Sequence, residues 1–144
     1  MNFEKFCTLL GHTIAYFQLI ENDIKLIYAA MSEGPVEQTM ERIDREKWTM
    51  GQAVMELQDL DYSDGMRYIS NDDYYFLRQL TGKRNHWCHE SVLTFVDKPN
   101  FVSSKEFYDE YNRLVKDNQR LQLISHNLEA VRRKAMADFK KNKR

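Results

Sequence analysis

The chain has 144 residues, the size of one ordinary domain. Its residues are 42% hydrophobic and 30% charged, with only 5 Gly and 2 Pro, which excludes a disordered tail and a sandwich of many short strands. The formal net charge of −1 excludes a uniformly basic nucleic-acid binder. The charge is divided unevenly: residues 131–144 hold seven basic residues and one acid, which leaves 14 basic and 21 acidic residues before them. We therefore expect one all-helical domain over residues 1–140, with a basic tail at 141–144.

Cysteine content and hydropathy indicate the compartment. Cys7 and Cys88 are the only cysteines, too few for a disulfide framework and consistent with a reducing compartment. The longest uncharged stretch, residues 6–20, is too short and too polar for a membrane span, and no positively charged leader precedes it. These features predict a cytoplasmic protein.

The first predicted helix has a seam of residues that alternate in steps of three and four. Eight of its nine members are apolar: Phe3, Phe6, Leu10, Thr13, Phe17, Ile20, Ile24, Ile27 and Met31, with Thr13 the exception. Such a 3.5-residue repeat is typical of a helix in a bundle. Gly34-Pro35 ends it, and the polar stretch to about Lys47 shows no strand alternation.

Three further helices follow in chain order. One begins near Thr49, which has capping-box spacing to Gln52, and ends in a loop at residues 61–65. The next begins at residues 70–73 and runs, with a weak point at Gly82, to Pro99-Asn100. A capping box at Ser103 and Glu106 opens the last, whose apolar stripe of some 30 residues is interrupted by Asn118 and Ser125. The pattern predicts an all-α bundle of four to five helices, with two long antiparallel helices.

Reactive side chains cluster in Lys83-Arg84-Asn85-His86-Trp87-Cys88-His89-Glu90. At about 100° per residue, Asn85 and His89 lie about 40° apart on a helix, whereas Arg84 lies about 140° from His89. One helix therefore cannot close Arg84 and His89 onto one small group. Two copies facing each other across a twofold axis can, which predicts a homodimer if the pair is functional.

The segment 84–89 resembles the Arg-polar-x-x-x-His motif of the HEPN superfamily, small helical-bundle domains that include many prokaryotic endoribonucleases. The resemblance extends to the first helix (Gly11, Phe17 and Glu21), to Thr49-Met50-Gly51-Gln52 and to Leu77-Arg78-Gln79-Leu80. The predicted arrangement of helices is similar over most of the chain, but the similarity in reactive side chains is limited to the one motif.

The resemblance implies metal-independent cleavage of RNA by a homodimer, without a cofactor. It also implies a role as a toxin with an antitoxin or as a defence protein. Arg84 would bind the scissile phosphate and His89 would serve as general base or acid. Asn85 would orient His89 or a phosphate oxygen, and His86 would support phosphate binding. Attack by the ribose 2′-hydroxyl would leave a cyclic phosphate. The basic residues from Arg132 onward would add nonspecific attraction for RNA.

One position departs from the toxin members of this family. They carry a tyrosine, a site of regulatory modification, two residues after the histidine, and here that position is Ser91. The resemblance therefore does not extend to a partner that modifies this tyrosine.

Other interpretations stay open. The chain can be a non-catalytic HEPN module for dimerisation, nucleotide binding or protein binding. Arg84 can form an ordinary ion pair, His86 can be structural, and Trp87 and Cys88 are expected to pack in the core. A metal site is also conceivable, built from His86, Cys88 and His89 with His12 or His126 from the long helices.

Overall fold

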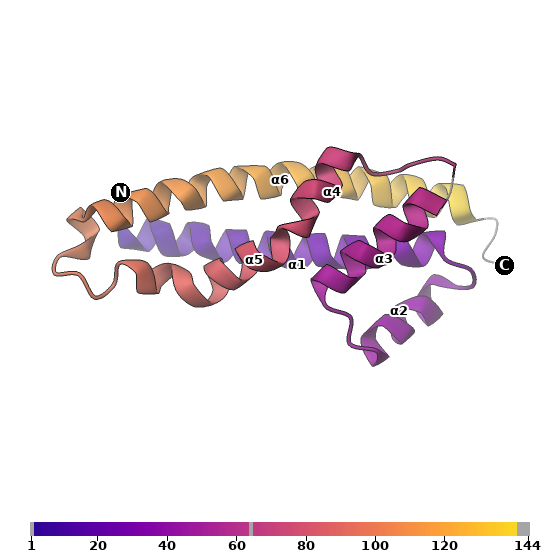
Figure 1. Cartoon of the computed structure of the whole chain (residues 1–144), viewed down its shortest axis with the longest axis horizontal. Helices are drawn as coiled ribbons and strands as arrows, with labels where there is room; N and C mark the ends of the chain where they lie inside the picture. Colours follow the sequence, from indigo (N-terminus) through magenta and orange to yellow (C-terminus); the bar gives the residue numbers. More distant parts are fainter. Residues whose placement is uncertain (1, 64, 141–144) are drawn as a thin grey trace.

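The computed structural model describes residues 2–63 and 65–140, and every regular element in this part of the chain is helical (Figure 1). The all-α bundle is thus confirmed. The α-helices are α1 (Phe3–Met31), α2 (Val36–Arg45), α3 (Met50–Ser63), α4 (Asn71–Arg78), α5 (Leu80–Asn85) and α6 (Lys105–Phe139). Three short helical turns lie between α5 and α6: the π-turn η1 (His86–Glu90) and the 3₁₀ turns η2 (Ser91–Thr94) and η3 (Phe101–Ser103). The predicted tail at 141–144 lies outside the described residues.

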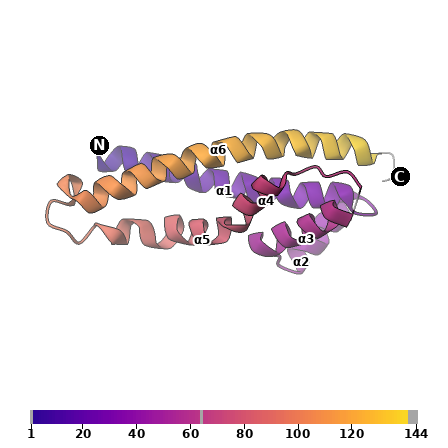
Figure 2. The same ribbon diagram turned by 45° about the horizontal axis from the view of Figure 1, so that its top comes forward.

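The two long helices α1 and α6 lie side by side and run in the same direction (Figures 1 and 2). Early residues meet early residues, since the Phe6 ring lies 5.6 Å from that of Phe107, and late residues meet late ones, since Arg132 pairs with Asp23 at 3.0 Å. The expected antiparallel arrangement is therefore wrong. The physical reason is the path of the intervening helices, which return the chain to the N-terminal end of α1 before α6 begins.

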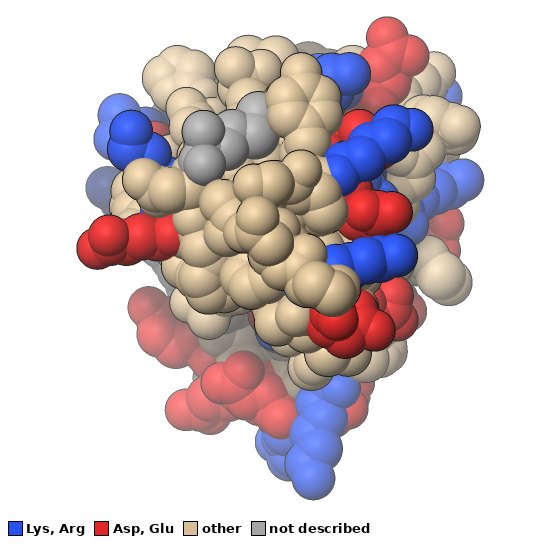
Figure 3. Space-filling view, turned by 90° about the vertical axis from the view of Figure 1, so that its left-hand side faces the viewer, with Lys and Arg blue, Asp and Glu red and all other residues tan. Residues whose placement is uncertain are grey.

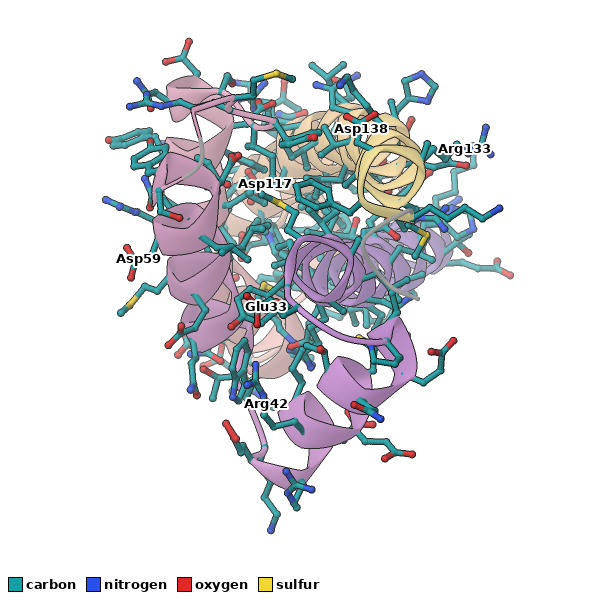
Figure 4. All side chains as sticks on the ribbon, turned by 90° about the vertical axis from the view of Figure 1, so that its right-hand side faces the viewer. Glu33, Arg42, Asp59, Asp117, Arg133 and Asp138 are labelled. Atoms are coloured by element: carbon teal, nitrogen blue, oxygen red, sulfur yellow. The ribbon has the colours of Figure 1, made fainter. Side chains whose placement is uncertain are left out.

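Helices α3, α4 and α5 cover one side of the α1–α6 pair and bury its seam, whereas α2 packs against α1. Ile20 and Ile24 of α1, Leu57 of α3, Leu77 of α4 and Leu121 of α6 are all at most 1% exposed. Viewed along the long helices, α3 with Asp59 lies on one side, and Arg133 of α6 points away on the opposite side (Figure 4). The opposite side of the pair is therefore open.

Helix starts follow the predicted caps with one shift. The hydroxyl of Thr49 accepts a hydrogen bond from the backbone N–H of Gln52 (3.1 Å), and Ser70 caps α4 in the same way. At α6 the cap is Ser104, which accepts from the N–H of Phe107 at 3.1 Å, because Ser103 belongs to the turn η3. The predicted capping box at Ser103 and Glu106 is therefore one residue early.

Three other boundaries differ from the expectation. Residues 36–45 form α2, although the stretch is polar, because Thr39 and Ile43 are buried. Residues 61–63 continue α3 instead of forming a loop, because the buried carboxylate of Asp61 accepts hydrogen bonds from residues beyond the turn. The helix expected from residue 70 breaks at Gln79 and not at Gly82.

In the part of the chain that the structure describes, no helix is long and apolar enough to cross a membrane.

Candidate functional site

The predicted motif lies where α5 widens into the π-turn η1. The backbone N–H of Ser91 donates to the carbonyl oxygen of His86, five residues back, instead of four as in an α-helix. Each residue of such a turn advances by a smaller angle than in an α-helix. Arg84 and His89 are five residues apart, so the π-turn makes the angle between them around the helix axis smaller than the 140° expected for a regular helix.

Arg84 is held by an acid of the first helix. Its Nη1 lies 3.4 Å from Oε1 of Glu21, and the side chain is 40% exposed. Glu21 also lies 4.0 Å from Nζ of Lys25, one turn later on α1. Because guanidinium has five N–H donors, this one contact orients Arg84 and leaves other donors accessible from solvent.

His89 is exposed, and its ring makes no hydrogen bond or ion pair with the residues that the structure describes. Asn85 and Cys88 are exposed as well, so the predicted packing role of Cys88 is wrong. No hydrogen bond joins Arg84, Asn85 and His89 within this described chain. Each of these side chains is therefore available to a ligand or to a second protomer.

His86 has a structural environment instead of an open one. Its Nε2 lies 3.0 Å from Oε1 of Glu110, and its Nδ1 lies 3.8 Å from Oε2 of Glu90. Glu110 is buried and also accepts a hydrogen bond from the hydroxyl of Thr94 (3.1 Å). Both ring nitrogens of His86 face carboxylates, and Nε2 fastens η1 to Glu110 of α6, while Thr94 fastens η2 to the same carboxylate. This favours the structural interpretation of His86.

A second acid of α6 anchors the same turn. Oδ2 of Asp117 accepts a 2.8 Å hydrogen bond from the indole Nε1 of Trp87, and its Oδ1 lies 3.0 Å from Nζ of Lys83. Trp87 is only 2% exposed, which confirms that it packs in the core. Arg113 lies over the indole ring at 5.6 Å. The backbone that carries His89 is thus fixed on the side facing α6.

Sequence reasoning missed these acidic partners. Glu110 and Asp117 are seven residues apart, so they share one face of α6, next to the apolar stripe of Phe107, Leu114 and Leu121. Carboxylates at the border of a buried stripe need donors, and that spacing was the available signal. Glu21 belongs to the resemblance of the first helix, but its pairing with Arg84 has no local signal in the sequence, because the two residues are 63 positions apart.

The described residues do not gather a metal site. No group of three or more His, Cys, Asp or Glu side chains in this part of the chain is placed to hold a metal ion. His12 and His126 are exposed on α1 and α6, in hollows that include neither His86 nor His89. Ser91 is 1% exposed and therefore closed to a modifying enzyme.

At the end of the molecule where α1 and α6 begin, positive and negative side chains are mixed on the surface. Lysine and arginine side chains alternate with acids around a broad uncharged surface (Figure 3). Leu93, Val96 and Val102 are exposed in the η2–η3 region. Basic residues near the end of α6 are paired as well, since Arg133 lies 2.7 Å from Glu129 and Lys134 lies 2.8 Å from Asp138. A continuous basic face is therefore not formed by the described residues.

Comparisons with known proteins leave the site to be interpreted on its own geometry. No family model matches the sequence, and neither the curated proteins nor the solved structures gave a match. A functional assignment for this chain therefore depends on the side chains of α5 and η1 and on their neighbours.

Proposed function

We propose that the chain is a metal-independent endoribonuclease of the HEPN type that acts as a homodimer, with Arg84 and His89 as its catalytic residues. The observation that carries the proposal is the contrast within one segment. Lys83, His86 and Trp87 bind acidic side chains of α6. By contrast, His89 is exposed and makes no hydrogen bond or ion pair with the described residues. Arg84 contacts Glu21, but its side chain is 40% exposed. A permanently charged guanidinium and a free imidazole are the groups that phosphodiester cleavage needs.

The reaction follows from these two groups. His89 accepts the proton of the ribose 2′-hydroxyl as its oxygen attacks the phosphorus, so a new 2′ O–P bond forms. The bond from phosphorus to the 5′ oxygen breaks, and that oxygen takes up the proton that His89 has just accepted, which returns the imidazole to its neutral form. Arg84 binds the non-bridging phosphate oxygens and stabilises the negative charge that grows on them. The products are a 2′,3′-cyclic phosphate and a 5′-hydroxyl, and DNA, which lacks the 2′-hydroxyl, is not cleaved.

A second protomer completes the site in this proposal. Arg84 and His89 have no hydrogen bond to each other in the described chain, and both are accessible. A twofold axis beside η1 lets the Arg84 of one protomer and the His89 of the other approach the same phosphate. Asn85 is exposed next to Arg84 in the chain, and in this proposal it orients His89 or a phosphate oxygen.

The mixed charge favours a second candidate, a non-catalytic HEPN module that dimerises or binds a protein or nucleotide. Glu21 and Asp117 offset the positive charges of Arg84 and Lys83, and the carboxylate of Glu110 occupies the ring nitrogen Nε2 of His86. Ion pairs likewise take up Arg132, Arg133 and Lys134, which weakens the expected attraction for RNA. A binding module does not need Arg84 and His89 to act on one phosphate, whereas the nuclease does.

The test is cleavage of RNA by the purified protein in excess EDTA, with Arg84→Ala and His89→Ala in parallel. His126→Ala is the matched control, because it removes an exposed histidine of α6 away from the motif. We expect cleavage by the wild type and the control, a cyclic-phosphate end on the product, and loss of cleavage in both motif variants while they remain folded. Cleavage that survives both substitutions contradicts the proposal. Binding without cleavage favours the non-catalytic module.

A further inference from the structure

The side of α1 and α6 that faces away from the shorter helices carries a long groove between the two helices. Its first hollow, of about 540 Å³, lies between Leu9 and His12 of α1 and Val115 of α6. The next, of about 650 Å³, lies between Tyr16 and Leu19 of α1 and Leu123 of α6. Figure 4 shows the same side at its far end, where Arg133 points into solvent. We call this surface the outer groove.

The outer groove has its own helical repeat. Its α1 residues Lys5, Leu9, His12, Tyr16 and Leu19 follow steps of four, three, four and three, one position away from the buried seam. A second seam on a 3.5-residue repeat is the pattern that accepts another helix by knobs-into-holes packing. Leu19 and Leu123 are 54% and 52% exposed, so apolar surface in this groove is left open to water.

Charges at the two ends of the outer groove are self-complementary. Lys5 and Glu4 line its first end, where their side chains make no ion pair within the described chain. Glu129 and Arg133 lie at the other end, where they pair with each other at 2.7 Å and remain exposed enough to join a larger network of charges. The hydrogen bond between Thr13 and Asn118 fixes the register of the helices, and it places Glu129 about level with residue 24 of α1. A twofold axis near the small, exposed Ala15 then sets Lys5 of one copy against Glu129 of another, and Glu4 against Arg133.

We propose that the outer groove binds a second copy of this chain, antiparallel to the first, through an isologous contact centred near Ala15. The same axis places Leu19 and Leu123 of one copy over Leu9 and Val115 of the other, so the apolar parts cover each other while opposite charges meet at both ends. The contact does not include Arg84 or His89, and it is independent of the nuclease proposal. If both contacts form, the chain assembles as a tetramer.

The mass of the full chain in solution tests this contact. We expect Leu19→Glu combined with Leu123→Glu to halve the mass measured by light scattering at micromolar concentration, because two carboxylates of each copy would then have to lie over the apolar Leu9 and Val115 of the other. Met55→Glu combined with Tyr75→Glu is the matched control, since these side chains are 60% and 71% exposed and lie on α3 and α4. It leaves the mass unchanged. Equal masses for the wild type and the groove variant overturn the proposal and leave the groove to a helix of another protein.

A cross-link locates the axis without depending on mass. In a Cys7→Ser, Cys88→Ser background, Ala15→Cys forms a disulfide between copies under mild oxidation, because the two thiols face each other near the axis. Asp59→Cys, which is exposed on the opposite side of the bundle (Figure 4), is the control and cross-links at least tenfold more slowly. Equal rates for the two cysteines overturn the proposed axis. RNA cleavage is measured separately, so a failure of either proposal leaves the other standing.

Discussion

The amide of Asn118 donates a 2.9 Å hydrogen bond to the hydroxyl of Thr13, joining the two long helices inside the core. Thr13 is the one polar member of the first helix's seam, and Asn118 interrupts the stripe of the last helix. Thr13 also donates to the carbonyl oxygen of Leu9 at 2.8 Å. A single buried polar pair in an apolar seam fixes which residues of two helices lie level, and here it specifies the register of the parallel pair.

This pair predicts an asymmetric effect of substitution. Thr13→Val leaves a buried amide donor of Asn118 without its partner and lowers the free energy of unfolding by about 1–3 kcal/mol. Adding Asn118→Leu removes the unpaired group, so the double variant recovers part of the loss. Urea denaturation of the two single variants and the double variant measures the coupling. Strictly additive losses would show that the hydrogen bond contributes nothing.

Glu21 is predicted to act through Arg84. Glu21→Gln keeps the size of the side chain but removes the charge that orients the guanidinium 3.4 Å away. We expect kcat for RNA cleavage to fall about tenfold to a hundredfold, as for a misplaced catalytic group. The free energy of unfolding changes by less than about 1 kcal/mol, because the pair is partly exposed. Lys25→Gln, which changes the other neighbour of Glu21, is the control; faster cleavage by Glu21→Gln would mean that Glu21 blocks Arg84.

Asp117 is predicted to stabilise the turn that carries His89. Asp117→Ala leaves the buried indole N–H of Trp87 and the ammonium of Lys83 without their acceptor, which costs about 2–3 kcal/mol of stability. Asp109→Ala removes an acid of the same helix whose side chain is 59% exposed, and it changes stability by less than about 0.5 kcal/mol. Thermal and urea unfolding of both variants make the comparison. Similar losses for the two would contradict the anchoring role.

The buried pair of Asp61 and Tyr74 predicts the alkaline limit of stability. Burial, and then the 2.7 Å hydrogen bond to Asp61, raise the pKa of the Tyr74 hydroxyl far above its ordinary value. The folded chain therefore keeps a proton that the unfolded chain loses above about pH 10, so this contribution is complete below pH 10 and declines as the pH rises further. Tyr74→Phe flattens that decline in denaturation between pH 8 and 11. An unchanged slope would place the alkaline sensitivity elsewhere.

The helical seams could be predicted from the sequence because they depend on local spacing alone. Phe6, Phe17 and Ile20 are fully buried, as their 3.5-residue repeat requires. The relative direction of the two long helices could not be predicted, because the apolar stripe of a helix has the same spacing whether its partner runs parallel or antiparallel. That direction depends on long-range contacts such as the one between Thr13 and Asn118.

The candidate site was only partly accessible to sequence reasoning. The motif residues Arg84 and His89 could be selected by type and spacing, and they are accessible as that selection requires. The π-turn could not be predicted, because Glu110 and Asp117 hold it from a distant helix through His86 and Trp87. The contact with Glu110 also gives His86 a structural role, which its position in the motif does not indicate.

In the proposed nuclease, one active site combines Arg84 of one protomer with His89 of the other. The most direct test mixes Arg84→Ala and His89→Ala chains, each inactive alone, after unfolding and refolding together. A mixed dimer keeps one intact site of two, and half of the dimers are mixed, so we expect about a quarter of the wild-type rate in EDTA. A mixture as inactive as its two components would contradict the shared site.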